Sequence, residues 1–367
     1  MACLFTDKAC PYQTQTDSFA LKYFCPIKAF MSIFSICRSC PGNSILLRAT
    51  LYKSKQLSYL TIGLGGGMYS SFDEISAEAK DIGPEKATVV FPHDLEVLSA
   101  IVDGMNERLI EPILIGDKLK IIQTATKGNI ALEKAQIIGI QDPQQASDLA
   151  LDLVKKGHAA FAVKGNILTT YLYRSLIRMT KQLTPDQTPC TLCFHHVGAM
   201  DKIFVITDPG VNIRPEISVK EKILSNALWV LRSLGCDRPR VMVLASRRFK
   251  GDSSVYTQEA EHLRNIADSG LFGPCEFLPY TDLAQFVQEL EIGHDTFPDL
   301  FLVPHIDAGN ILVKTIDHIM GGKRQCLTVG AGMIVLTPSR SDGYEVRIQN
   351  LSLGLVVGRA TSKNRKP

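Results

Sequence analysis

Short apolar runs alternate with helix-period segments along the chain after Met68, and this alternation constrains the fold more than any other feature. The first apolar runs, which we expect to be buried strands, are 87–91, 112–116, 135–140 and 159–165. Between them, 94–108, 117–126 and 142–156 have helical spacing, with Asp94, Asp117 and Asp142 at the expected N-caps and Gly157 as a stop. Regular alternation of strand and helix predicts a parallel sheet covered by helices on both faces.

The same alternation resumes further along the chain. Segment 167–179 has helical spacing, and 180–193, which carries two prolines and no periodicity, is predicted to be a loop at a domain junction. Later strands are expected at 202–208, 240–245, 275–279, 299–304, 326–330 and 333–337. Later helices are expected at 218–234, 256–268, 281–291 and 307–319, followed by an amphipathic segment at 343–357.

Residues 1–67 differ in composition from the rest of the chain. They carry seven Lys and Arg against two Asp, whereas the remainder of the chain carries 33 basic against 35 acidic residues. The charge balance of this remainder does not favour nucleic-acid binding. The apolar stretch 29–37 is too short to span a bilayer, so we predict no membrane anchor. The glycines of "GLGGGM" (63–68) do not have the spacing of a phosphate-binding loop. They are interpreted as a linker or as a translated ribosome-binding site, in which case the native protein would start at Met68.

The cysteines include two Cys-x-x-Cys pairs, Cys37/Cys40 and Cys190/Cys193. Together the two pairs could bind zinc, although about 150 residues separate them and no compact knuckle pattern is present. Buried thiols in a reducing cytoplasm are the interpretation that we favour, and no metal is predicted.

Polar residues follow several of the predicted strands, and open parallel sheets bind ligands at the carboxyl ends of their strands. Four such segments stand out: 164–166 with Lys164, 207–212 with Asp208 and Asn212, 305–310 with Asn310, and 339–342. These segments supply the candidate site residues.

The last of these segments, Ser339-Arg340-Ser341-Asp342, is the most informative. A guanidinium offers a planar fork of donors for phosphate oxygens, a hydroxyl adds a neutral donor, and a carboxylate can accept a proton. The segment therefore predicts an anion site with an adjacent base. The alternative is an Asp that caps the final helix beside a surface Arg.

Two other segments leave a structural and a functional interpretation open. Asp208 and Asn212 flank a tight Pro-Gly turn, which fits either ligand binding or an Asx-turn that needs no ligand. Asp307 is predicted to cap a helix whose first turn, with Gly309 and Asn310, allows close backbone approach. His305 is interpreted as a buried histidine rather than a catalyst.

Taken together, these motifs resemble the phosphate acetyltransferase/phosphate butyryltransferase family. The resemblance covers nearly all of 68–358, through segments such as "EPILIGDKLKI", "AAFAVKGNILTTYLYR", "ITDPGVNIRP", "DLFLVPHIDAGNILVK" and "VLTPSRSD". It implies an α/β protein of the isocitrate/isopropylmalate-dehydrogenase-like fold, with two three-layer α/β/α domains, parallel-rich sheets and an active site in the cleft. One domain would comprise 68–190 plus 326–360 and the other 191–325, and 1–67 have no counterpart.

The resemblance also implies the activity. Family members transfer a short acyl group between coenzyme A and inorganic phosphate, need no redox cofactor, and usually form homodimers. Carried over, Ser339 and Arg340 would bind phosphate and stabilise developing charge, and Asp342 would deprotonate the thiol of coenzyme A. Lys164, Asp208, Asn212 and Asn310 would contact substrate.

Two alternatives stay open. Loops that differ from the family pattern, such as 246–254, suggest a relative that binds coenzyme A or acyl phosphate without turnover. A dehydrogenase of the same fold would need a metal or nicotinamide site, for which the sequence shows no cluster of Asp ligands on one helix.

Overall fold

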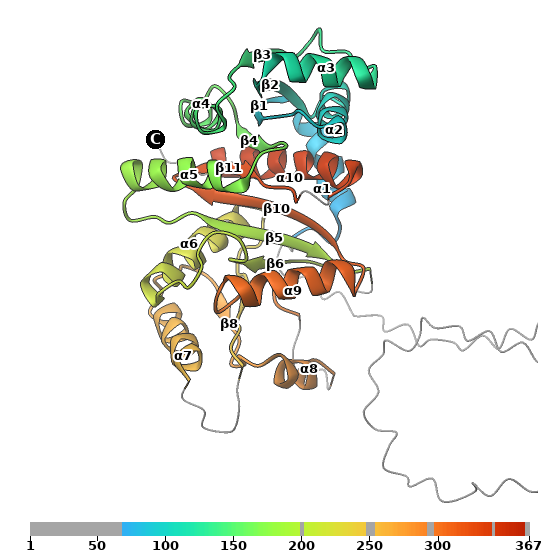
Figure 1. Ribbon diagram of the computed structural model, residues 1–367. Coiled ribbons are helices and arrows are strands. Elements are labelled where there is room, and N and C mark those ends of the chain that lie inside the picture. Colours follow the sequence, from blue (N-terminus) through green and yellow to red (C-terminus); the bar gives the residue numbers. More distant parts are fainter. Residues whose placement is uncertain (1–67, 199–201, 247–253, 292–296, 340–341, 364–367) are drawn as a thin grey trace, which may run out of the picture. The chain divides into compact units, whose positions relative to one another are not determined.

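The computed structural model describes residues 68–198, 202–246, 254–291, 297–339 and 342–363. These residues form one sheet of 11 strands with helices on both of its faces (Figure 1). The strand order across the sheet is β3-β2-β1-β4-β11-β10-β5-β6-β9-β7-β8. Residues 1–67, including the glycines, lie outside the described part of the chain.

The strands are β1 (Glu85–Val90), β2 (Ile110–Gly116), β3 (Gln136–Gly139), β4 (Phe161–Lys164), β5 (Cys190–His196), β6 (Ile203–Thr207), β7 (Arg240–Val243), β8 (Glu276–Phe277), β9 (Leu300–Leu302), β10 (Lys323–Gly330) and β11 (Met333–Leu336). The helices are α1 (Phe72–Ile82), α2 (Leu95–Asn106), α3 (Lys118–Gly128), α4 (Pro143–Lys155), α5 (Thr169–Leu183), α6 (Ile217–Ser233), α7 (Val255–Asp268), α8 (Leu283–Glu291), α9 (Ile306–His318) and α10 (Tyr344–Lys363).

The sheet is parallel on both sides of an antiparallel centre. Strands β3, β2, β1, β4 and β11 pair in parallel, as do β6, β9, β7 and β8. Between these groups, β10 runs antiparallel to both β11 and β5, and β5 runs antiparallel to β6. The short connections from β5 to β6 and from β10 to β11 explain the reversal, because parallel neighbours need a longer crossover. The α/β class with a parallel-rich sheet is confirmed.

The two faces of the sheet have different cores. One face carries a continuous apolar core that runs from α1 and α2 through α10 to α6 and α7. The other face carries two separate cores, one under α4 and α5 and one under α8 and α9. The face with two cores therefore has a gap in its apolar packing over the antiparallel centre of the sheet.

The last helix differs from its prediction. Segment 343–357 was expected to be amphipathic, but α10 is buried on almost all sides from Asn350 to Val357. It packs against α1, α2, α6 and the strands β10, β11 and β4. A helix that is covered on every side has no solvent-facing stripe, so an amphipathic pattern is not required of it.

The predicted loop at 180–193 is also partly wrong. Helix α5 continues to Leu183, and β5 already begins at Cys190, so that only 184–189 connect the two elements. In β5, Cys190, Leu192 and Phe194 make up the apolar face, and Thr191 and Cys193 lie on the other face. So short an alternation is hard to recognise as a strand from the sequence. The division into domains at 190/191 and 325/326 stays a prediction, and both boundaries fall on the paired strands β5 and β10.

Helix capping follows the sequence with one exception. The carboxylates of Asp94, Asp117 and Asp142 accept N–H groups from the first turns of α2, α3 and α4, which confirms these caps. At α9 the cap is His305, whose Nδ1 accepts the backbone N–H of Ala308 at 3.3 Å. The predicted Asp307 cap is therefore wrong, because the helix begins one residue before it.

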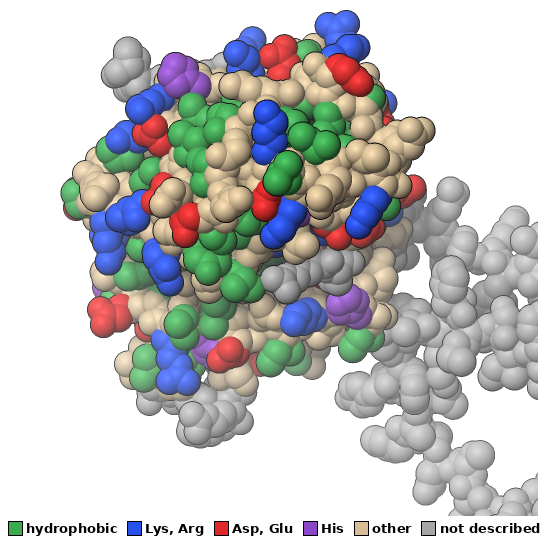
Figure 2. All heavy atoms as spheres, turned by 45° about the horizontal axis from the view of Figure 1, so that its top comes forward, with side chains coloured by type: hydrophobic (Ala, Val, Ile, Leu, Met, Phe, Trp, Pro, Cys, Tyr) green, Lys and Arg blue, Asp and Glu red, His purple; other side chains and the backbone are tan. Residues whose placement is uncertain are grey.

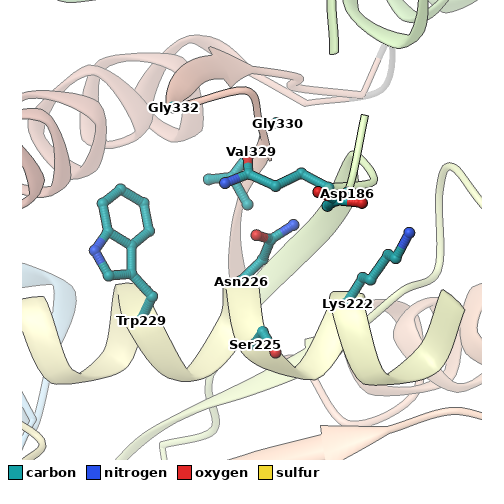
Figure 3. Close-up of a pocket in the computed structure, with 9 residues that line it drawn as sticks. Asp186, Lys222, Ser225, Asn226, Trp229, Val329, Gly330 and Gly332 are labelled. Atoms are coloured by element: carbon teal, nitrogen blue, oxygen red, sulfur yellow. The ribbon is translucent and has the colours of Figure 1, made fainter. Parts of the chain in front are cut away.

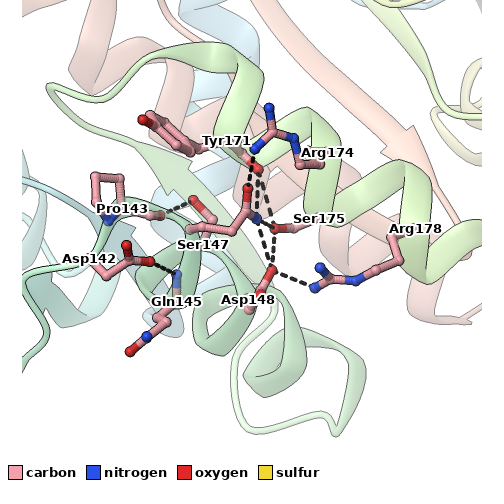
Figure 4. A network of polar contacts seen from close by, with 10 residues as sticks. Asp142, Pro143, Gln145, Ser147, Asp148, Tyr171, Arg174, Ser175 and Arg178 are labelled. Atoms are coloured by element: carbon pink, nitrogen blue, oxygen red, sulfur yellow. Dashed lines mark hydrogen bonds and ion pairs between the residues drawn. The ribbon is translucent and has the colours of Figure 1, made fainter.

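A polar network joins α4 to α5 (Figure 4). Asp148 accepts a hydrogen bond from Ser175 and forms an ion pair with Arg178 at 2.6 Å. Ser175 and Arg178 both lie on α5, so these contacts tie α5 to α4.

The face of the molecule in Figure 2 carries basic and acidic side chains interspersed among apolar ones. Within the described residues, none of the helices combines the length and the apolar character that a membrane crossing requires.

Candidate functional site

A cavity of about 170 Å³ lies over the antiparallel centre of the sheet. Its walls come from α5, β5, α9, β10 and the segment that follows β11, and they include Tyr173, Thr191, Asn310, Arg324 and Ser339. Both cores of that face adjoin it, since α5 belongs to one and α9 to the other. The cavity thus brings together segments that are far apart in the sequence, including three of the four predicted polar segments, 207–212, 305–310 and 339–342.

Strand alternation makes the floor of this cavity polar. Successive side chains of a strand point to opposite faces, so Thr191, Cys193 and His195 of β5 share one face, while Leu192 and Phe194 join the continuous core on the other. On β10, Arg324, Cys326 and Thr328 share the cavity face in the same way. The central strand pair therefore has an apolar side and a polar side.

Hydroxyl groups connect the floor to α5. Tyr173 Oη lies 3.1 Å from Thr191 Oγ1 and 3.3 Å from Thr328 Oγ1, and the two threonine oxygens are 3.0 Å apart. Burial raises the pKa of Tyr173 to about 12, so this residue acts as a neutral hydroxyl. Sequence reasoning missed all three residues, although the alternation of polar residues along 190–196 was a signal for a strand with a polar face.

A buried group of charges lies at one end of the cavity. Arg324 donates through Nε to Asp317 Oδ2 at 2.7 Å and through Nη2 to Asp342 Oδ1 at 3.0 Å. His195 Nε2 lies 3.6 Å from the other Asp317 oxygen. Burial alone would raise the pKa of Asp317, but His195 and Arg324 outweigh it and hold this pKa below its ordinary value of 3.8. No pattern in the sequence indicated that Arg324 pairs with Asp342.

Two of the predicted catalytic residues are described, and they lie together. The backbone N–H of Ser339 donates to Asp342 Oδ2 at 2.6 Å, and Arg347 Nη2 donates to the Ser339 carbonyl at 3.1 Å. Asp342 thus accepts one donor on each oxygen, and a carboxylate has about four lone-pair sites, so room for a proton is left. Arg340 and Ser341 lie outside the described residues.

Asp208 and Asn212 form a closed turn beside the cavity. Asp208 Oδ1 accepts the backbone N–H groups of Thr191, Gly210 and Val211, and Oδ2 accepts two N–H groups of Asn212. The second amide hydrogen of Asn212 goes to the Pro189 carbonyl at 2.8 Å. The geometry is that of the Asx-turn, and it aims these polar groups at the protein rather than at the cavity.

The turn reaches the cavity through its glycine. Gly210 lines the cavity, and a Cβ added there would lie 2.6 Å from Thr191 Oγ1. Only a residue without a side chain lets the backbone approach the threonine floor this closely. Asn310 is exposed on the first turns of α9 and also lines the cavity.

Lys164 lies elsewhere. It is buried at the end of β4, where its Nζ donates to the Gly165 carbonyl at 3.4 Å. It lines a small separate hollow together with Pro338 and Arg347. The structure therefore brings Ser339 and Asn310 to one cavity, with Asp342 bonded to Ser339 and Arg324 of its wall, and leaves Lys164 in a separate hollow.

A second and larger hollow, of about 420 Å³, lies between α6 and the turn from β10 to β11 (Figure 3). Lys222, Asn226 and Trp229 point into it from α6, and Gly330 and Gly332 border it from the turn. It contains none of the predicted site residues, so volume alone does not identify the site.

The two cysteines of the second Cys-x-x-Cys pair face away from each other. Cys190 belongs to the continuous core and Cys193 to the core under α8 and α9, because residues three apart on a strand point to opposite faces. They cannot ligate one ion together, and among the described residues no group of three or more His, Cys, Asp or Glu could hold a metal. Cys37 and Cys40 lie outside the described residues.

Comparison with known proteins gives relatives along most of the chain. A phosphate butyryltransferase of Clostridium beijerinckii is 28% identical over 297 residues, which are 79% of this chain and 98% of that protein. A phosphate acetyltransferase of Rickettsia felis is 27% identical over 285 residues, covering 76% and 82%.

The fold has solved counterparts too. A phosphotransacetylase from Streptococcus pyogenes superposes with a TM-score of 0.66 at 18% identity, over 80% of this chain and 99% of that one. No family model matches the sequence. Over these residues the chain is therefore similar in sequence to phosphate butyryltransferases and phosphate acetyltransferases, and it shares the fold of a phosphotransacetylase.

Proposed function

We propose that this protein is an enzyme of the phosphate acyltransferase type, which transfers a short acyl group, acetyl or butyryl, reversibly between coenzyme A and inorganic phosphate. The observation that carries the proposal is the similarity over 98% of the length of a phosphate butyryltransferase. The proposal includes coenzyme A as a substrate, no redox cofactor, a homodimeric assembly and a cytoplasmic location.

The cavity supplies groups for this reaction. We assign Ser339 and the neighbouring Arg340 to the phosphate, because a hydroxyl and a guanidinium are suited to its oxygens. Asn310 lines the same cavity as Ser339 and is assigned to substrate. Asp208 and Asn212 are assigned an indirect role, in which their closed turn fixes Gly210 at the cavity wall.

Asp342 is the proposed base for the thiol of coenzyme A. A thiol has a pKa above neutrality and must lose its proton to attack an acyl carbonyl, and the oxyanion that forms needs donors already in place. Asp342 keeps lone pairs for that proton while Arg324 and the Ser339 N–H hold its orientation. Lys164 is assigned to the support of the segment that carries Ser339.

A thiol-release assay tests the activity. The full chain is mixed with a panel of acyl-coenzyme A esters, with and without phosphate, and free thiol is followed. Phosphate-dependent release with one short acyl group is expected. Release that does not need phosphate, or no release for any ester, would overturn the proposal, and ester binding without turnover would favour the non-catalytic alternative.

The Arg340→Ala variant tests the site. Loss of one donor to developing charge is expected to lower turnover by about 100- to 1000-fold. Arg178→Ala is the matched control, since Arg178 lies on α5 in the network with Asp148 and is not part of the cavity. Normal turnover in Arg340→Ala would remove Arg340 from the mechanism.

A further inference from the structure

Two cysteines of the cavity wall lie side by side although 133 positions separate them in the sequence. Cys193 on β5 and Cys326 on β10 are direct partners in the register of the antiparallel pair. Their Sγ atoms are 2.7 Å apart, both are free thiols, and both line the cavity. Directly opposed residues of antiparallel strands have Cα atoms about 4.5 to 5.5 Å apart, within the range of about 4.4 to 6.8 Å that disulfides span.

The two sulfur atoms have different surroundings. Arg324 Nη1 donates to Cys326 Sγ at 2.9 Å. Burial would raise the pKa of Cys326, but the hydrogen bond from Cys193 and the charge of Arg324 outweigh it and lower the pKa below its usual range. Burial raises the pKa of Cys193, which stays a thiol. Cys326 is thus the nucleophile of the pair and Cys193 the proton-bearing partner.

The other described cysteines lack this combination. Burial raises the pKa of Cys190, Cys236 and Cys275, in the case of Cys236 to about 12. None of the three lines this cavity. A thiolate beside a guanidinium, next to a second thiol that can resolve it, is the arrangement that makes cysteine oxidation selective.

We propose that Cys193 and Cys326 form an oxidisable dithiol site that reacts with small peroxides entering the cavity. The Cys326 thiolate attacks one oxygen of hydrogen peroxide, the O–O bond breaks, and Cys326 becomes a sulfenic acid. The hydroxide that leaves takes up the proton that Cys326 released on ionisation and becomes water. The Cys193 sulfur then attacks Cys326 Sγ, its proton goes to the departing hydroxyl as water, and a disulfide forms. Two thiols and one peroxide thereby give one disulfide and two water molecules. A cavity of about 170 Å³ has room for several molecules of that size.

The inference goes beyond the proposed function and does not depend on acyl transfer, because its test measures mass. The reduced full chain is treated with hydrogen peroxide at one equivalent per chain, blocked with an alkylating reagent and digested with trypsin without reduction. A cross-link is expected between the peptides 182–202 and 325–340, lighter than their sum by two hydrogen atoms and lost after reduction. Fragmentation of the cross-linked peptides should place the disulfide on Cys193 and Cys326. Cys326 should also be oxidised at least about tenfold faster than Cys236 or Cys275.

Variants separate the two roles. Cys193→Ser should stop the reaction at a sulfenic acid on Cys326, trapped by a cyclic diketone, and Cys326→Ser should abolish the cross-link. Cys190→Ser is the matched control from the other face of β5, and it should keep the cross-link. Pairing of Cys326 with any cysteine except Cys193, or oxidation of Cys326 no faster than that of Cys236, would overturn the proposal. Because Cys193→Ser keeps the nucleophile, absence of trapped sulfenic acid in that variant would overturn it as well.

Discussion

Replacing Arg324 with Met tests whether the buried charges by the cavity stabilise the fold. Asp317 and Asp342 keep only 12% and 10% of their side chains exposed, and both depend on the same guanidinium, itself 13% exposed. Methionine fills much of the space of the Arg stem but removes the guanidinium from both carboxylates. Removing one partner of a buried ion pair costs about 3–5 kcal/mol, and we expect a loss of stability in that range at neutral pH.

The size of the loss should depend on pH in a definite direction. Because the pKa of Asp317 is held below 3.8, its pairing contributes stability that is fully present above pH 3.8 and is lost as pH falls through the folded-state pKa. The difference between wild type and Arg324→Met should therefore be largest at neutral pH and shrink below about pH 4.

Urea unfolding measures the difference in free energy. Far-UV circular dichroism and the fluorescence of Trp229, the single tryptophan, should give coincident transitions if unfolding is two-state. Arg178→Met is the control, because Arg178 and Asp148 are 44% and 33% exposed and such a pair is worth about 0.2–1 kcal/mol. A loss below about 1 kcal/mol for Arg324→Met, equal to that of the control, would refute the reasoning.

Two further predictions concern close packing and titration. At Gly309, an added Cβ would lie 2.8 Å from Val303 Cγ2 and 3.0 Å from the Pro209 Cα, so Gly309→Ala should lower the free energy of unfolding in urea by about 1–3 kcal/mol. Gly139→Ala is the control, because its Cβ would meet only Lys118 Cβ at 3.6 Å, and its loss should be smaller. Equal losses would contradict the packing argument. At His93, burial lowers the pKa, and Nε2 accepts the backbone N–H of Asp117 at 3.0 Å, which requires the neutral ring. Below pH 6.5 the unfolded chain binds a proton at His93, whereas the ring stays neutral in the folded protein. The contribution of His93 to the free energy of unfolding should therefore decrease from pH 6.5 downward, by at most about 1.4 kcal/mol per pH unit. The His93→Gln variant should lose that part of the slope, and an unchanged slope would show that His93 does not titrate this way.

Local sequence determined the class of the fold. The periodicities of 2 and 3.6 residues placed almost all strands and helices, and three aspartates marked helix starts that the structure has, because capping depends on residues within one turn. The local pattern gave wrong predictions where the burial of a segment depends on the elements that pack against it. Helix α10 is covered by other helices and the sheet, and β5 carries Thr191 and Cys193 on the face that lines the cavity.

The candidate site divides in the same way. The sequence by itself determined which polar segments follow strands, and Ser339 and Asn310 line one cavity, with Asp342 hydrogen-bonded to Ser339. Only the tertiary structure decided that Asp208 and Asn212 satisfy each other, that Lys164 lies in a separate hollow, and that Arg324 joins Asp317 to Asp342. The pairing of Cys193 with Cys326 likewise follows from the register of β5 against β10. Register and strand order bring together residues that are far apart along the chain, and the periodicity of each segment carries no information about the other.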